Sequence, residues 1–318
     1  MLGSYVNIDR SMVEPNLDRV DVIIPVKNTK DNWENCLDSF YREIPINRLL
    51  IGDGGCTDNT IEIVRKYPRV RVLDQSKFKT LGYRIKCLIK EVETEWFVYL
   101  HSDVSLPTGW YDEMCKYRKQ WDWFECRRVA VYHFEEELKD QFESHRAYSG
   151  SQMGRREAFT NIIKDIEDDY VYRMEDLLLQ ERIEDAGYKY GKVPTIFHYH
   201  HARKVRGEYE PQLRFRVSRS STKDWEIYVA EGMIKGIIKY MSPEKRANVV
   251  TVNKNVEKLM NLGVWNREEW KKWVRQVNLS WEEKIHFKPS FKFKLKLLIK
   301  RVHLGGFVNF LLGRKVIE

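Results

Sequence analysis

The chain has 318 residues, of which 42% are apolar and 32% charged, and its formal net charge is +8. This length suffices for one large domain, or for one domain with an appendage. No apolar run approaches the roughly 20 residues of a membrane-spanning helix, and the amino terminus lacks the basic-then-apolar pattern of a signal peptide. Five scattered cysteines without a Cys-x-x-Cys pair argue against a disulfide framework or a zinc cluster. These features predict a cytoplasmic protein.

Apolar, strand-like segments alternate with helical segments from residue 20 to about residue 201. In chain order we expect a strand over 20–26, a helix over 31–41, a strand ending at 53, helices over 58–66 and 80–92, strands over 96–100 and 130–134, a helix over 175–186 and a strand over 195–200. This alternation is typical of βαβ units, so the sequence predicts an α/β fold with a mostly parallel sheet.

Polar residues come directly at the ends of three of these strands. Lys27 and Asn28 follow the first strand, Asp53-Gly54-Gly55 ends the second, and His101-Ser102-Asp103 follows the third. Ligands of open α/β sheets bind in the crevice at the carboxyl edge of the strands. The sequence therefore predicts a ligand site built from these turns.

The composition changes after about residue 210. From Pro211 to the end the chain has 23 Lys and Arg residues against 10 Asp and Glu, a net charge of +13, whereas the rest of the chain has −5. Helical spacing predicts helices over 224–241, 256–262 and 266–277. The segment Phe291–Leu297 alternates like a strand but also fits one helical face, so periodicity leaves both structures open. The basic region predicts an anionic partner, such as lipid, nucleic acid or a phosphorylated acceptor.

The turn after the second strand belongs to a longer motif, Leu50-Ile51-Gly52-Asp53-Gly54-Gly55-Cys56-Thr57-Asp58. With the other strand-end motifs in order, it resembles glycosyltransferase family 2, the inverting GT-A enzymes that use nucleotide-sugars. The family usually has serine where this chain has Cys56. The resemblance implies a GT-A domain over residues 20–210, with a Rossmann-like, mostly parallel sheet and flanking helices. Residues 1–19 would then be a polar lead-in, and residues 211–318 a basic, mainly helical region.

The resemblance implies that the ends of the first two strands hold the nucleoside of a donor, with a UDP-sugar favoured. Pro25, Val26 and Asn28 would line the pocket, and Asp53 would bond the base or the ribose. Gly54 would let the backbone approach the ligand closely. A tight strand-to-helix turn without a ligand is the alternative interpretation of the glycine pair.

The same resemblance implies contacts with the donor's diphosphate. Arg84 and Ser102 are candidates for this role. Residues 149–159 resemble the family's small-residue loop and Arg-Arg helix start, where Arg155 or Arg156 would contact phosphate, because a guanidinium matches phosphate oxygens. A solvent-facing arginine is the alternative for this pair.

GT-A enzymes carry an Asp-x-Asp motif whose last acid binds a divalent metal, Mn²⁺ or Mg²⁺. Asp103 matches that position, but His101 replaces the first acid, and imidazole cannot offer two anionic oxygens. The family often adds a histidine six residues after a proline, which selects His200. His198 lies on the same strand face and is the second choice. An imidazole ligand would shift the preference toward manganese.

For the acceptor, Glu175-Asp176 at the start of a helix resembles the family's Glu-Asp motif. Adjacent acids repel each other, and one can have a raised pKa suited to proton abstraction. Asp176 matches the catalytic base, and Glu175 would orient the acceptor or support the site. Stabilisation of the helix dipole by acids in the first turn is the alternative.

Other classes fit parts of the pattern. A catalytically inactive GT-A-like protein that binds nucleotide, glycan or nucleic acid is the main alternative, supported by His101 and by the basic region. No nucleic-acid motif accompanies that region, so we expect no nucleic-acid partner. A nucleotidyltransferase would need a glycine-rich, lysine-containing loop after Ile24, which this chain lacks.

The acceptor would be a glycan or a lipid-linked molecule. The interleaved Phe, Leu and Lys residues near the end of the chain could bind peripherally to the cytoplasmic face of an anionic membrane. They could equally pack on the GT-A domain or form an oligomer contact.

Overall fold

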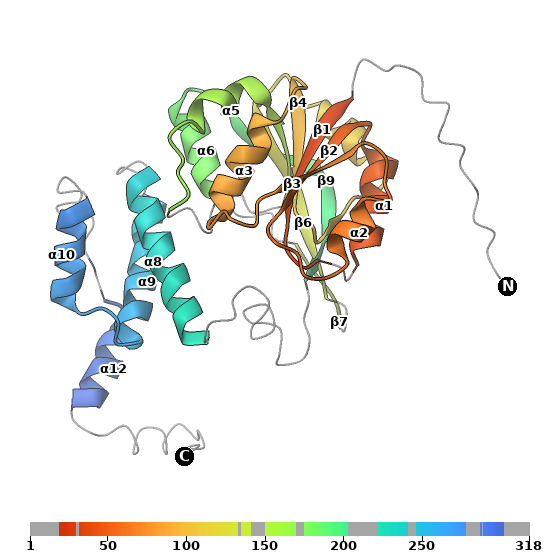
Figure 1. Cartoon of the computed structure of the whole chain (residues 1–318). Helices are drawn as coiled ribbons and strands as arrows, with labels where there is room; N and C mark the ends of the chain where they lie inside the picture. The colour runs from red at the N-terminus through yellow and green to blue at the C-terminus, as the bar shows by residue number, and fades with distance from the viewer. Residues whose placement is uncertain are drawn as a thin grey trace. The chain divides into compact units, whose positions relative to one another are not determined.

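The computed structural model describes residues 19–29, 32–132, 135–140, 150–169, 175–202, 222–240, 246–277, 287 and 289–301. The chain divides into two compact units. The first comprises residues 1–165 and 182–210, and the second comprises residues 166–181 and 211–318. The elements of both are labelled in Figure 1.

The first unit is built on one mixed sheet with the strand order β3-β2-β1-β4-β8-β6-β9-β5, and β7 pairs with β6. The strands are β1 (Val20–Val26), β2 (Ile46–Asp53), β3 (Val70–Asp74), β4 (Trp96–Leu100), β5 (Val104–Ser105), β6 (Trp123–Tyr132), β7 (Glu135–Asp140), β8 (Ser151–Arg155) and β9 (Tyr190–Ala202). Strands β3, β2, β1 and β4 are mutually parallel, β8 is antiparallel to β4 and β6, and β6 is parallel to β9.

Helices cover both faces of the parallel part of this sheet. Figure 1 shows α1 (Trp33–Glu43) and α2 (Thr60–Val64) on one side and α3 (Leu81–Lys90) and α5 (Arg156–Ile162) on the other. Helix α4 (Trp110–Cys115) follows β5. Strands buried on both faces read as continuous apolar runs, and Val22, Ile23 and Ile24 of β1 are fully buried. The expected α/β fold is confirmed.

Two expectations for the first unit were wrong in detail. Residues 151–155, expected as a loop, form the buried strand β8 at the centre of the sheet. The strand expected over 130–134 begins earlier, at Trp123, because its first half pairs with β8. The sequence of β8, Ser-Gln-Met-Gly-Arg, shows no apolar alternation, so only its partners β4 and β6 identify it as a strand.

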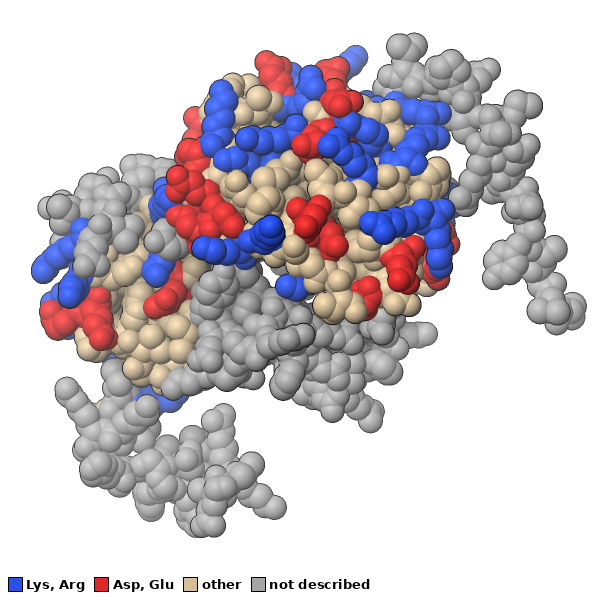
Figure 2. Space-filling model, in the orientation of Figure 1, with Lys and Arg blue, Asp and Glu red and all other residues tan. Residues whose placement is uncertain are grey.

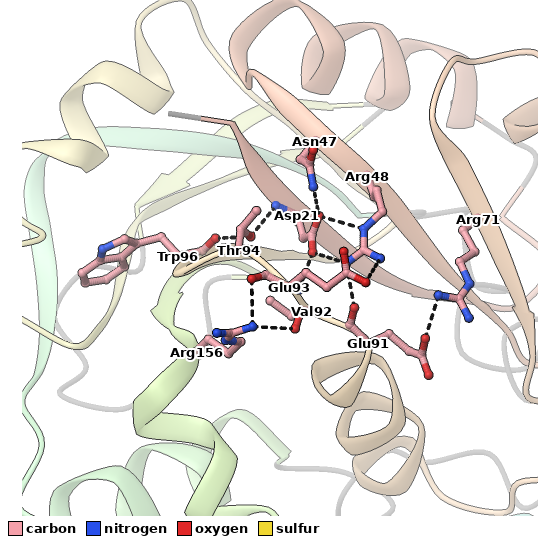
Figure 3. A network of polar contacts seen from close by, with 10 residues as sticks. All are labelled: Asp21, Asn47, Arg48, Arg71, Glu91, Val92, Glu93, Thr94, Trp96 and Arg156. Carbon is pink, nitrogen blue, oxygen red and sulfur yellow. Dashed lines mark hydrogen bonds and ion pairs between the residues drawn. The ribbon is translucent and has the colours of Figure 1, made fainter. Parts of the chain in front are cut away.

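A closed polar network ties together the amino-terminal ends of these strands (Figure 3). At its centre is Asp21 of β1, which is fully buried. Its carboxylate accepts hydrogen bonds from Arg48 Nη2 (2.6 Å), from Asn47 Nδ2 (2.9 Å) and from the backbone N–H of Glu93 (2.7 Å). Burial alone raises the pKa of Asp21, but the hydrogen bonds from Arg48 and from Glu93 outweigh it and hold the pKa below its ordinary value.

The surface of the first unit is mixed in charge. On the face seen in Figure 2, acidic side chains lie among the basic ones. This pattern differs from the single-sign basic stripe that is typical of nucleic-acid-binding surfaces.

The second unit contains α8 (Thr222–Tyr240), α9 (Arg246–Asn261), α10 (Arg267–Val277) and α12 (Phe291–Arg301). Residues 166–169 also belong to this unit and contact the last residues of α8. The Tyr240 hydroxyl donates to Asp169 (2.8 Å) and accepts the N–H of Glu167 (3.0 Å), while Lys239 Nζ bonds Glu167 (2.7 Å). None of the described helices is long and apolar enough to cross a membrane.

Residues 291–301 form a helix, which decides the alternative that periodicity left open. Helix α12 begins at a Ser290 cap, whose hydroxyl accepts the N–H of Phe293 (3.1 Å) and donates to Glu257 of α9 (3.1 Å). Phe293 is buried, whereas Phe291, Leu295 and Leu298 are 82%, 45% and 57% exposed.

Candidate active site

The strand order creates a switch point at the carboxyl end of β1. This strand lies between β2 and β4, so the chain leaves β1 toward one side and later returns on the other. The crevice at such a point is where open α/β sheets bind ligands. Here the hydroxyl of Thr29 donates to the carbonyl of Ser102 (3.4 Å), so the loops after β1 and β4 meet.

Asp53 organises the turn after β2. Its Oδ1 accepts the backbone N–H groups of Gly55 (2.9 Å) and Cys56 (2.8 Å). Gly55 has φ of 84°, a left-handed conformation that glycine adopts without steric cost. The N–H of Gly54 donates to the carbonyl of Val26 (2.9 Å). The ends of β1 and β2, which the sequence assigned to the nucleoside, are therefore hydrogen-bonded to each other.

Asn28 holds the other side of this turn. Its Oδ1 accepts the N–H of Thr57 (2.8 Å), and its own N–H donates to Cys56 Sγ (3.4 Å). Burial is the main cause that raises the pKa of the Cys56 thiol to about 12, so it is protonated at neutral pH. Cys56 thus supplies a hydrogen-bond acceptor for Asn28 at the position where the family usually has serine. Pro25, near the end of β1, pairs with Gly52 of β2.

Arg84 of α3 packs against the same turn. A Cβ added to Gly54 would lie 2.4 Å from Arg84 Nη1, so only glycine leaves room for the guanidinium there. Arg84 Nη2 donates to the carbonyl of Phe78 (2.5 Å), which fixes the side chain over the turn. A cation is therefore placed over the turn after β2, and its contact with phosphate stays a prediction.

Asp103 lies in the turn between β4 and β5 and contacts β9. Its Oδ2 is 3.3 Å from His200 Nε2, and its carbonyl accepts the N–H of His201 (2.7 Å). The side chain of Asp103 is 46% exposed and that of His200 is 12% exposed. The structure thus brings together two of the residues that the sequence assigned to a metal.

His200 keeps Asp103 ionised. Burial alone raises the pKa of the Asp103 carboxyl, but the nearby charge and hydrogen bond of His200 outweigh it and hold the pKa well below its usual range. At position 101, burial is the main cause that lowers the pKa of the imidazole to about 4. His101 is therefore uncharged at neutral pH, at the position where the family motif has an acid.

Asp103 and His200 fit a divalent ion. Their donor atoms are 3.3 Å apart, close to the separation of neighbouring ligands around a six-coordinate ion with bonds of about 2.1 Å. Such ions often take their remaining ligands from water and substrate phosphates. The mixed oxygen and nitrogen donor set suits Mn²⁺ better than Mg²⁺.

The other two histidines of β9 have different surroundings. His198 is fully buried, and its Nδ1 is 2.8 Å from the hydroxyl of Ser151 and 3.5 Å from Cys126 Sγ. His201 Nε2 is 2.7 Å from the hydroxyl of Ser105. Of the two proposed metal-binding histidines, the geometry favours His200, because His198 packs among β6 and β8.

Arg155 lies at the wrong end of the sheet for a phosphate contact. Because β8 is antiparallel to β4, Arg155 pairs with Trp96 at the start of β4, whereas Ser151 pairs with Leu100 at its end. Arg155 contacts Asp122 (3.3 Å), and Arg156 donates to the carbonyl of Glu93 (2.8 Å) within the network of Figure 3. Both arginines therefore lie away from the strand-end site. The motif alone did not reveal that β8 runs antiparallel to β4.

Glu175 and Asp176 begin α6 (Glu175–Asp185), the helix that the sequence predicts there. Each is 7% exposed, and both lie in the first turn, where the helix dipole favours negative charge. Toward the end of the helix, Arg182 Nε donates to the carbonyl of Ile162 (2.6 Å) and its guanidinium pairs with Asp165. The catalytic roles of the two acids stay predictions.

Comparisons with known proteins identify the class. The family model described as Glycosyl transferase family 2 matches residues 21–163. The fold is similar to that of S. aureus TarS in complex with UDP-GlcNAc, at 15% identity and a TM-score of 0.51, covering 82% of each chain. It is also similar to the mannosyltransferase PcManGT from Pyrobaculum calidifontis in complex with GDP-Man and Mn²⁺ (14% identity, TM-score 0.50, 94% and 89% covered). A third similar structure is that of GalNAc-T7 with UDP, GalNAc and Mn²⁺ (12% identity, TM-score 0.53, 89% of this chain and 58% of that chain covered). No curated protein matches the chain.

The fold is that of the GT-A glycosyltransferases. Residues 21–163 match the model of glycosyltransferase family 2, and this match identifies them as a glycosyltransferase domain.

Proposed function

We propose that this protein transfers a sugar from a nucleoside-diphosphate donor, with a UDP-sugar favoured, to a hydroxyl of a glycan or lipid-linked acceptor, with inversion at the anomeric carbon. The observation that carries the proposal is the Asp103–His200 pair, 3.3 Å apart, beside the switch point of a family 2 domain. Pro25, Val26 and the Asp53 turn would hold the nucleoside there.

Asp103 and His200 would hold a divalent ion, Mn²⁺ in preference to Mg²⁺. When bound, such an ion supplies positive charge that stabilises the departing diphosphate. His200 also holds the pKa of Asp103 low, so the carboxylate stays ionised into the acidic range. Arg84, placed on the Gly54 turn, and Ser102 would add contacts to the phosphates.

In the proposed reaction, Asp176 removes the proton from the acceptor hydroxyl. The resulting oxygen forms a bond to the anomeric carbon while the bond from that carbon to the diphosphate oxygen breaks, and the nucleoside diphosphate leaves with the electron pair. Glu175 would orient the acceptor. The motif supports these roles, and both acids are buried, each with 7% of its surface exposed.

Calorimetric titration tests the donor site. We would titrate UDP, GDP, TDP and CMP, each with and without Mn²⁺, into the wild type and into Asp103→Asn. Asp38→Asn is the matched control, because Asp38 lies on α1 and accepts the Tyr67 hydroxyl (2.7 Å). We expect one nucleoside diphosphate to bind in a Mn²⁺-dependent manner, and only Asp103→Asn to lose that dependence. Binding of none of the four by the wild type would contradict the proposed donor site.

The general base is tested by slow transfer to water, which needs no identified acceptor. We expect the wild type to release UDP or GDP from UDP-GlcNAc, UDP-galactose or GDP-mannose, and Asp176→Asn to bind the nucleotide but turn over at least about 100-fold more slowly. Asp185→Asn, at the other end of the same helix, is the control. NMR of the freshly released sugar should show the β anomer from an α-linked donor, and the α anomer would contradict inversion.

A finer proposal concerns an anionic lipid surface as partner. The exposed side chains Phe291, Leu295 and Leu298 lie at positions i, i+4 and i+7 of α12, on one face of the helix. Exposed lysines at 292, 294 and 296 surround this stripe. A helix with apolar residues on one face and lysines beside them suits the interface of an anionic bilayer.

Liposome co-sedimentation of the full chain tests this docking. We expect binding to vesicles that contain phosphatidylserine, and loss of binding in a variant with Lys292, Lys294 and Lys296 changed to Glu. The control variant changes Lys271 and Lys272 of α10 instead. Equal sedimentation of the wild type with neutral and anionic vesicles would contradict the proposal.

A further inference from the structure

Arg128 of β6 lies at the same edge of the sheet as Asp103. Strand β8 is antiparallel to both β4 and β6, and it aligns Phe97 of β4 with Trp123 of β6 through Gly154. Continuing this alignment along the two parallel strands places Arg128 level with Ser102. One strand separates β4 from β6, a spacing of about 10 Å, which the long side chain of an arginine can largely span.

The register with β9 shows which way Arg128 points. Arg128 pairs with His198, and both lie on the face of the sheet that carries Cys126 and His200, because side chains two residues apart share a face. Cys126 Sγ is indeed 3.5 Å from His198 Nδ1. The neighbouring Arg127 points to the opposite face.

Arg128 lies next to the metal-binding candidates of β9. Its partner in the register, His198, is two residues from His200, and His200 Nε2 lies 3.3 Å from Asp103 Oδ2.

No partner among the described residues accounts for Arg128. Its side chain is half-buried, and its Nε atom is buried without a hydrogen-bond partner. Within the part of the chain that the structure describes, no acid forms an ion pair with it. A half-buried guanidinium without a carboxylate is costly unless a ligand supplies the anion.

We infer that Arg128 is a binding residue for the diphosphate of the donor, beside the Asp103–His200 pair. This inference rests on the proposed function and deepens it. A guanidinium presents a planar fork of donors that matches phosphate oxygens, and charge-assisted bonds of this kind are the strong ones. The site would then neutralise the diphosphate with two positive groups, the ion on Asp103 and Arg128.

Calorimetry separates a phosphate contact from a structural role. We would titrate UDP, UMP and uridine, and GDP, GMP and guanosine, into the wild type, Arg128→Gln and Arg127→Gln at a fixed Mn²⁺ concentration. Arg127→Gln removes the same charge from the opposite face of the same strand. Thermal melting of each variant reports its folding.

We expect Arg128→Gln to weaken binding of the nucleoside diphosphate at least about tenfold, with a smaller loss for the monophosphate and none for the nucleoside. Arg127→Gln should bind all three as the wild type does, and Arg128→Lys should fall in between because it keeps the charge without the fork. Equal affinity of Arg128→Gln and the wild type for the diphosphate would overturn the inference alone. An equal loss for the nucleoside would overturn it too, because it would show a structural role. Failure of the wild type to bind any nucleotide would instead overturn the proposed function, and the inference with it.

Discussion

The two edges of the sheet in the first unit use charged residues in opposite ways. At the amino edge, Asp21 accepts hydrogen bonds from two side chains and a backbone N–H, and is fully buried (Figure 3). At the carboxyl edge, the Asp103 side chain is 46% exposed, with His200 beside it. Nδ1 of His200 and Nε of Arg128 are buried there without hydrogen-bond partners among the described residues. One edge satisfies its charges internally and stabilises the fold, whereas the other leaves polar atoms available to a ligand.

The largest effect should come from Asp103→Asn. Removing the carboxylate that would hold the metal should slow turnover of the nucleotide-sugar about 1,000-fold, or about 4 kcal/mol in activation free energy. Because Asp103 is not part of a closed internal network, thermal stability should change little. A discontinuous assay of nucleotide release, run beside a melting curve, checks both; turnover within tenfold of the wild type would contradict the assignment.

The opposite result is expected at the amino edge. Asp21→Ala leaves the Arg48 guanidinium without its buried partner and should lower the free energy of unfolding by about 3 kcal/mol. Turnover per folded molecule should be unchanged, since Asp21 lies at the far end of β1 from the site. Urea denaturation followed by circular dichroism measures the loss. Exposed Glu34→Ala, which removes only the surface pair with Lys66, is the control and should cost under about 1 kcal/mol.

A smaller effect is expected at Gly150, which accepts the N–H of His101 (2.8 Å). Gly150 has φ of 83°, and an added Cβ would lie 2.8 Å from His101 Nδ1. Gly150→Ala should therefore cost about 2 kcal/mol through strain and crowding and disturb nucleotide binding. Gly109→Ala is the matched control, since its φ is 80° but nothing lies within 4 Å. Equal losses in the two variants would show that contact with His101 contributes nothing.

A pH dependence also separates the two edges. The folded pKa of His101, about 4, lies below its ordinary 6.5, so the unfolded chain takes up this proton first. The contribution of neutral His101 to the free energy of unfolding is then fully present above pH 6.5 and is lost as the pH falls toward 4. The pKa of Asp21 is also lowered, from 3.8, so its stability is lost only at more acidic pH.

Unfolding free energies measured from pH 7.5 to 3 should show these two windows. We expect His101→Asn to flatten the curve between pH 6.5 and 4, and Asp21→Asn to flatten only the acidic end. A His101→Asn curve parallel to that of the wild type would mean that this imidazole titrates normally in the folded protein.

Much of the fold and part of the site were determined by the sequence itself. The strand–turn patterns that end at Val26, Asp53 and Leu100 are local, and a buried parallel strand followed by a polar turn has few other structures open to it. The resemblance added Asp103 and His200, 97 residues apart in sequence, and the structure brings them to 3.3 Å.

Only the tertiary structure decided which edge each arginine faces. A one-residue change of register or a reversed strand moves a side chain to another face or to the other end of the sheet, and no local pattern reveals either. Thus Arg155, which a motif placed at the phosphates, lies beside Trp96 because β8 runs antiparallel to β4. Arg128, which no motif marked, reaches the site because β6 runs parallel to β9 with His198 alongside. Likewise Phe291–Leu297 fitted both periodicities, and packing of Phe293 beneath the Ser290 cap made it helical.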